Sequence, residues 1–138
     1  MVYTEKKEQL DGDKLIWIPY NTPSSKNSKQ WTGKFLISSK TVKEYEKKTK
    51  LHWIQNRDTF KQLIEGKEKP YLVAFHFVRK SKHKFDFINA CQIVQDLMVH
   101  YGWIDDDNMD ELIPNCLVID DRFYTYNKDN PGVYISII

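Results

Sequence analysis

The sequence contains few of the residues that build disulfide scaffolds or metal-binding fingers. Only two cysteines occur among its 138 residues, Cys91 and Cys116, and they stand far apart with no Cys-x-x-Cys spacing. Cys91 falls on the inward side of a predicted helix, where a thiol behaves as a small apolar group. We therefore expect Cys91 to be a buried free thiol rather than part of a disulfide or a metal ligand.

Long apolar runs are missing as well. The first fourteen residues lack the apolar core of a signal peptide, and no segment approaches the length of about 20 apolar residues that a transmembrane helix needs. The apolar fraction of 41% and the aromatic fraction of 14% are typical of a globular protein rather than a disordered one. We expect a soluble, cytoplasmic protein that does not engage membranes. It would form one domain over residues 1–138, with residues 1–13 as a flexible N-terminal segment.

The net charge of +2 gives little information, but the distribution of charge along the chain is uneven. Eight lysines lie between Lys26 and Lys50 against two glutamates, and the stretch RKSKHK (79–84) contains no acid. The acids gather instead after Gly102, in GWIDDDNMDE. Such segregation is typical of a surface that meets a polyanion and contains an acidic pocket. Solvated helix faces and loops would give the same pattern.

Hydrophobic patterns predict strands at residues 14–19, 33–38, 71–78, 115–120, 122–126 and 133–138. The run 71–78 is almost entirely apolar, so we expect it at the centre of a sheet. One helix is predicted from Ser38 or Ser39 to Gly66, and its sparse apolar residues indicate that it is broken or peripheral. A second helix, over 85–102, has a clear apolar face. The order predicts a small α/β (α+β) domain with a mixed sheet and two main helices.

Carboxylates stand at both ends of the second predicted helix. Asp86 opens this helix, and the acidic turn with Asp106 and Asp107 follows its end at Gly102. The helical residues between them separate the two ends by roughly 20 Å or more. The ends can meet only if the chain after Gly102 doubles back along the polar face of the helix, or if another subunit supplies one of them. Carboxylates that meet would suit Mg²⁺ or Mn²⁺, which prefer oxygen ligands and activate water for attack on a phosphodiester.

The same region resembles the RusA-like Holliday-junction resolvases, a family of endodeoxyribonucleases. In that family a D-x-D-N motif opens a helix of the form N-x-x-K-x-x-x-D-x-L, and a glycine and an Asp-Asp pair follow it. Here the sequence is D-F-I-N-A-C-Q-I-V-Q-D-L, followed after the helix by G-W-I-D-D-D. The stretches TPSSKNSKQ, SSKTVKEY and PGVYISI look like further pieces of the family pattern. The residues that match the central motif without a gap are Asn89, Asp96, Gly102, Asp106 and Asp107.

The resemblance implies a homodimeric, Mg²⁺-dependent endonuclease that also accepts Mn²⁺. Its substrates would be four-way junctions or related branched DNA, cut by paired phosphodiester hydrolysis in DNA recombination and repair. Matched residue by residue, the resemblance implies catalytic roles for Asp86, Asn89, Asp106 and Asp107, with the three aspartates as metal ligands. Basic surface would hold the DNA by attraction to its phosphates. The expected DNA-binding residues are Lys26, Lys29, Arg79, Lys80, Lys82 and Lys84.

Two positions depart from the family motif. Ile88 stands where the family has its second aspartate, and Gln92 where it has a lysine that helps at the scissile phosphate. The first change removes a metal ligand, and the second removes a positive charge that would stabilise the transition state. Three hypotheses remain: an active nuclease with a rearranged site, a relative that binds branched nucleic acid with weak or no cleavage, and a small interaction protein whose acidic turn keeps it soluble. Candidates to replace the lost groups are Asp105, Glu111, Lys82 and Lys84.

Overall fold

The computed structural model of the protein describes residues 15–24, 29–31, 36–38 and 40–138. The predicted flexible segment 1–13 and the candidate DNA-binding residue Lys26 lie outside these residues, as does the side chain of Lys29. Neither helix in the described part of the chain combines the length and the hydrophobicity that crossing a bilayer requires.

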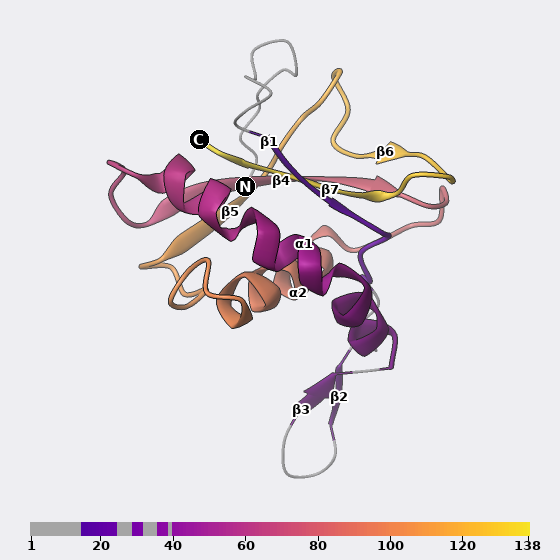
Figure 1. Ribbon diagram of the computed structural model, residues 1–138. Coiled ribbons are helices and arrows are strands. Elements are labelled where there is room, and N and C mark those ends of the chain that lie inside the picture. Colours follow the sequence, from indigo (N-terminus) through magenta and orange to yellow (C-terminus); the bar gives the residue numbers. More distant parts are fainter. Residues whose placement is uncertain (1–14, 25–28, 32–35, 39) are drawn as a thin grey trace.

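The described residues form a small α+β domain with a mixed sheet and two helices, as the sequence predicts, and the sheet has five strands (Figure 1). The strand order is β1-β7-β4-β5, and β6 pairs with the end of β4 beyond β5. β7 is antiparallel to β1 and β4, whereas β5 and β6 are parallel to β4. β2 (Lys29–Trp31) and β3 (Leu36–Ser38) form a separate antiparallel pair. The five strands of the main sheet are β1 (Leu15–Pro19), β4 (Tyr71–Arg79), β5 (Leu112–Cys116), β6 (Thr125–Tyr126) and β7 (Gly132–Ile137).

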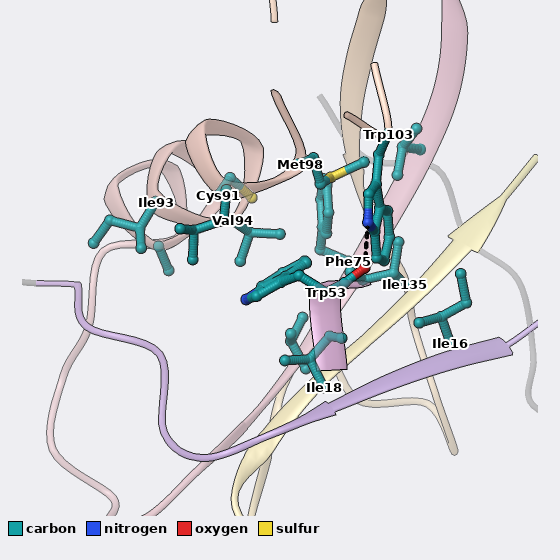
Figure 2. Close-up of a cluster of buried hydrophobic side chains, with 14 of the residues drawn as sticks. Ile16, Ile18, Trp53, Phe75, Cys91, Ile93, Val94, Met98, Trp103 and Ile135 are labelled. Carbon is teal, nitrogen blue, oxygen red and sulfur yellow. Dashed lines mark hydrogen bonds between the residues drawn. The ribbon is translucent and has the colours of Figure 1, made fainter. Parts of the chain in front are cut away.

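Two helices, α1 (Lys40–Ile64) and α2 (Phe87–His100), cover the same face of this sheet (Figure 1). The main core fills the space between the helices and the sheet, and Figure 2 shows part of it. Cys91 lies in this core as a free thiol, as the sequence predicts. The labelled side chains are Ile16, Ile18, Trp53, Phe75, Cys91, Ile93, Val94, Met98, Trp103 and Ile135.

α1 differs from the prediction, because it is continuous over 25 residues and contributes fully buried aromatic rings to the core. Its buried stripe includes Thr49, a polar residue that makes the apolar pattern look interrupted. The Thr49 hydroxyl donates to the carbonyl oxygen of Tyr45 at 2.7 Å and accepts from Nε1 of Trp53 at 2.8 Å. A hydroxyl whose donor and acceptor hydrogen bonds are both satisfied can be buried on an apolar face. Thr49 therefore does not interrupt α1.

α2 matches its prediction closely and ends in a Schellman motif. Asp86 is its N-cap, and Gly102 follows its C-terminal end with φ of 78°. The N–H of Gly102 donates to the carbonyl of Val99 at 3.1 Å, and that of Trp103 donates to Met98 at 2.8 Å. These are the two backbone bonds of the motif, and the positive φ explains why glycine stands there.

The predicted strands after the acidic turn need correction. The strand predicted over 115–120 lies instead at Leu112–Cys116, and the strand predicted over 122–126 is reduced to Thr125–Tyr126. Pro114 interrupts the apolar run, but β5 is an edge strand, where proline is tolerated because one side of the backbone needs no partner. The strand therefore begins directly after the acidic turn, which fixes that turn against the start of β4.

Candidate functional site

The start of α2 joins segments that are distant in the sequence. The exposed Asp86 carboxylate accepts the backbone N–H of Asn89 at 3.1 Å, which satisfies one of the free donors at the helix N-terminus. The amide nitrogen of the Asn89 side chain donates to the carbonyl oxygen of Ser24 at 3.2 Å. Asn89 therefore links the first turn of α2 to Ser24, which lies in the TPSSKNSKQ stretch that the sequence singled out.

Arg79, at the end of β4, holds the same stretch from the other side. Its guanidinium donates to the carbonyl oxygen of Thr22 and to the hydroxyl of Ser24, the latter at 3.3 Å. It also stacks over the Phe85 ring, 4.5 Å from the centroid. Burial lowers the pKa of Arg79 below its usual value. Of the expected DNA-binding residues, this one is thus engaged in joining β4, the TPSS stretch and the approach to α2.

The acidic turn at the other end of α2 is anchored by a buried indole. Trp103 is fully buried, and its Nε1 donates to the carbonyl oxygen of Trp53 at 2.7 Å (Figure 2). Its ring centroid lies 5.2 Å from that of Trp53 and 5.1 Å from that of Phe60. Ile104 is buried beside it. These contacts set where the following carboxylates can lie.

Asp106 and Asp107 lie together, and the turn doubles back far enough to bring Asp107 near α2. Asp106 accepts the backbone N–H of Asp107 at 2.7 Å and the side-chain amide of Asn108 at 3.2 Å. Partial burial raises the pKa of Asp107, and the negative charges of Asp96 and Asp106 raise it further. Asp96, on α2, is a residue that the site prediction omitted, although it matches the family motif. Carboxylates held together against their repulsion are typical of cation-binding and catalytic positions.

The two reserve ligands, Asp105 and Glu111, are occupied elsewhere. Both bind the ammonium group of Lys69, Glu111 at 2.9 Å and Asp105 at 3.4 Å. The hydrogen bond to Glu111, more than any other contact, raises the pKa of Lys69. This clamp ties the acidic turn to the start of β4 and directs both carboxylates towards Lys69.

The structure does not bring the three expected metal ligands together. Asp86 and Asp96 are ten residues apart, about 15 Å along the axis of α2, and besides partial burial it is the charge of Asp96 that raises the pKa of Asp107. Among the described residues, no group of three or more His, Cys, Asp or Glu side chains can hold one ion. Asp106 and Asp107 remain a pair of neighbouring carboxylates, the number through which Mg²⁺ is commonly bound when water and substrate phosphates supply its other ligands.

Lysines surround a cleft between the start of α1, the end of β1 and the turn before β7. The cleft has a volume of about 350 Å³ and is lined by Lys48, Lys80 and Lys128, with Glu44 as its one acid. The backbone N–H of Lys80 donates to the side-chain oxygen of Asn21 at 2.9 Å. Lys80 is one of the predicted DNA-binding residues, whereas Lys128 was missed because it stands alone in a turn.

The rest of the basic loop is open to solvent. Lys82 and Lys84 are exposed, and the Lys82 ammonium lies 5.6 Å from the centre of the Tyr126 ring. Ser81, Lys82, His83 and Tyr126 line a second, shallower cleft. Both lysines can therefore reach an anionic ligand.

The two departures from the family motif also lie on the surface of α2. Ile88 is 66% exposed, and Gln92 is exposed one turn further along. Ile88 borders an apolar groove that also contains Phe123 and Tyr124, two residues that the sequence indicated only as part of a strand. No protein-family model matches this chain, and no curated protein sequence matches it significantly.

Proposed function

We propose that the protein is a divalent-metal-dependent endonuclease that acts on four-way junctions or related branched DNA. One observation carries the proposal: Asp107 is held beside Asp96 and Asp106, and its pKa is raised by burial and by their charges. A bound cation would relieve this repulsion. The family resemblance of the motif containing Asp86 and Asn89 supports the choice of substrate.

In this proposal Asp106 and Asp107 hold Mg²⁺ or Mn²⁺ and leave the remaining positions to water and phosphate oxygens. When bound, the ion would activate water and stabilise the charge that develops on the attacked phosphate. Asp86 caps α2 and orients Asn89 towards the TPSS stretch. Its carboxylate can join the pair only through movement of the turn along α2 or from a second subunit. A homodimer with two-fold symmetry would place one site on each of the two strands that paired cleavage cuts.

The basic surface supports DNA as the ligand. Lys48, Lys80 and Lys128 line one cleft, and Lys82 and Lys84 continue the basic surface along the loop before α2. Lysines arranged in this way neutralise backbone phosphates without reading base sequence, so affinity should fall steeply as the salt concentration rises.

The test is incubation of a synthetic four-way junction with Mg²⁺ or Mn²⁺, using the wild type, Asp107→Asn and Asp110→Asn. Asp110 is exposed in the same turn and serves as the matched control. We expect paired nicks from the wild type and the control, and a loss of at least about 100-fold for Asp107→Asn, the usual scale for removing a catalytic group. Equal cleavage by Asp107→Asn, or no cleavage with either metal, would contradict the proposal.

A second candidate function is binding of branched DNA without cleavage. It is favoured by Gln92 at the position of the family lysine and by the separation of Asp86 from Asp107 along α2. Tight, salt-dependent junction binding with no cleavage in either metal would support this candidate. A protein that neither binds nor cuts the junction would leave the interaction-protein hypothesis.

A further inference from the structure

An apolar groove opens beside the first turn of α2. It has a volume of about 460 Å³, within the usual range for small-ligand sites. Its walls come from the first turn of α2 and Phe85 just before the helix cap, from β5, and from the segment that leads into β6. The lining residues are Phe85, Phe87, Ile88, Pro114, Cys116, Phe123 and Tyr124.

The groove gathers several exposed apolar side chains in one place. Ile88 is 66% exposed, Phe123 59% and Tyr124 41%, although each could be polar at no cost to the core. Contiguous exposed apolar surface is a feature of ligand-binding grooves and interaction sites. The groove is therefore a candidate binding site.

Three of the aromatic walls, Phe85, Phe87 and Tyr124, pack against other rings before any ligand arrives. Phe85 meets Tyr124 edge-on at a centroid distance of 5.1 Å, and Phe87 meets the buried ring of Phe77 at 5.6 Å. The guanidinium of Arg79 covers the Phe85 ring. Rings fixed in this way lose little conformational freedom on binding, which favours a flat, rigid ligand.

The charges around the groove narrow the choice of ligand. The exposed lysines of the loop 80–84 lead directly into Phe85, and Asp86 stands between two of the lining phenylalanines. A ligand that carries phosphates next to an apolar ring system would satisfy both the lysines and the groove. A nucleotide within a DNA strand has this composition.

We propose that the groove takes up one unpaired or unstacked nucleobase of the DNA whose backbone the 80–84 loop contacts. The identity of the ligand rests on the proposed function, but base uptake does not depend on hydrolysis. Ile88, which replaces an acid of the family motif, then acts as an apolar wedge against the base, and Phe123 and Tyr124 provide the stacking surface. An unpaired or unstacked base occurs at branch points and not in intact duplex, so the groove would select branched DNA.

The experiment measures binding in EDTA, where no metal-dependent cleavage occurs. One probe is a duplex with a single bulged adenine, and the other has an abasic residue at the same position. The variants are Phe123→Ala, Ile88→Gln and the control Leu51→Ala, whose side chain on α1 is 66% exposed outside the groove. We expect the wild type and Leu51→Ala to prefer the base over the abasic site by about 5-fold or more, the lower end of what one stacked base contributes.

Both groove variants should lose this preference while they bind the abasic probe as the wild type does. Equal binding of the two probes by the wild type would overturn the inference, as would a preference unchanged in both variants. Sedimentation of the same proteins tests a second copy of the chain as the occupant. If Phe123→Ala weakens a dimer and leaves the preference for the base intact, the groove is a subunit interface and the inference is wrong.

These results are separable from the cleavage test. A base preference that disappears in Phe123→Ala supports base uptake by the groove. This holds even if Asp107→Asn cuts like the wild type, and then only the nuclease proposal fails. If cleavage depends on Asp107 but the wild type shows no preference for the base, only the proposal of base uptake by the groove is wrong. Absence of any DNA binding would overturn both.

Discussion

The two ends of α2 are built in opposite ways. At the C-terminal end, a Schellman motif leads into Trp103, which is fully buried and bonded to the backbone of α1. At the N-terminal end, the cap Asp86 is exposed, and the residues beside it leave apolar and basic groups in solvent. The residues that follow the C-terminal end are buried in the core, whereas the cap at the N-terminal end is exposed and makes its hydrogen bond at the surface.

This difference separates positions that determine stability from positions that are available to a ligand. The carboxylates of the acidic turn sit on a rigid base, so Asp107 can be held near Asp96 despite their repulsion. The N-terminal end packs Ala90 and Cys91 into the core but leaves the groove and the lysines on the surface. Substitutions at the two ends should therefore differ in the size of their effects on stability, and at the acidic end the effects should differ in sign as well.

The largest effect is expected from Trp103→Ala. It removes a fully buried indole and leaves the carbonyl oxygen of Trp53 without its partner, so we expect a loss of about 3–5 kcal/mol in the free energy of unfolding. Urea denaturation followed by circular dichroism measures it. Met109→Ala, in the same turn but 61% exposed, is the control and should change stability by less than about 0.5 kcal/mol. Similar losses in the two variants would show that the turn is not anchored by the indole.

A smaller effect is expected at the N-terminal cap. Asp86→Ala removes the acceptor for the N–H of Asn89 and should cost about 1 kcal/mol, whereas Asp86→Asn keeps an acceptor and should cost only a few tenths. The same denaturation experiment compares the two. If both variants lose equal stability, the charge rather than the cap stabilises this end. Asp86→Asn is also the variant in which any change in cleavage can be assigned to the lost charge.

Much of the fold was predictable because its signals are local. The apolar run of β4 and the periodic face of α2 each identify an element without reference to the rest of the chain. The errors came from residues whose role depends on tertiary partners. Thr49 looks like a break in α1 until its hydroxyl is paired with Trp53, and Pro114 looks unsuited to a strand until β5 is placed at the sheet edge.

The candidate site was less predictable than the fold. Sequence register identified Asp106 and Asp107 as a pair, but their approach to Asp96 depends on the bond between Trp103 and Trp53, which are 50 residues apart. The groove depends in the same way on placing Phe123 and Tyr124 near the first turn of α2, through the pairing of β6 with β4. Contacts of this kind leave no periodic signal in the sequence.

The smallest expected effect has the opposite sign and is found at Asp107. The pKa of Asp107 is raised in the folded protein. At a pH between the unfolded and the folded pKa, the native state therefore holds a proton that the unfolded chain has already released. Stability should therefore fall as the pH rises through the interval between the unfolded and the folded pKa, and it should stay lower at neutral pH.

Asp107→Asn removes this effect, so we expect a gain in stability at pH 7, within about 0.5 kcal/mol because the side chain is partly exposed. The gain should vanish below the ordinary aspartate pKa of about 3.9. Urea midpoints from pH 7.5 down to 3.5, with Asp110→Asn as the control, measure it. A loss of stability at pH 7 would show that the Asp107 carboxylate stabilises the turn. The carboxylates at this end of α2 would then not be held together against their repulsion.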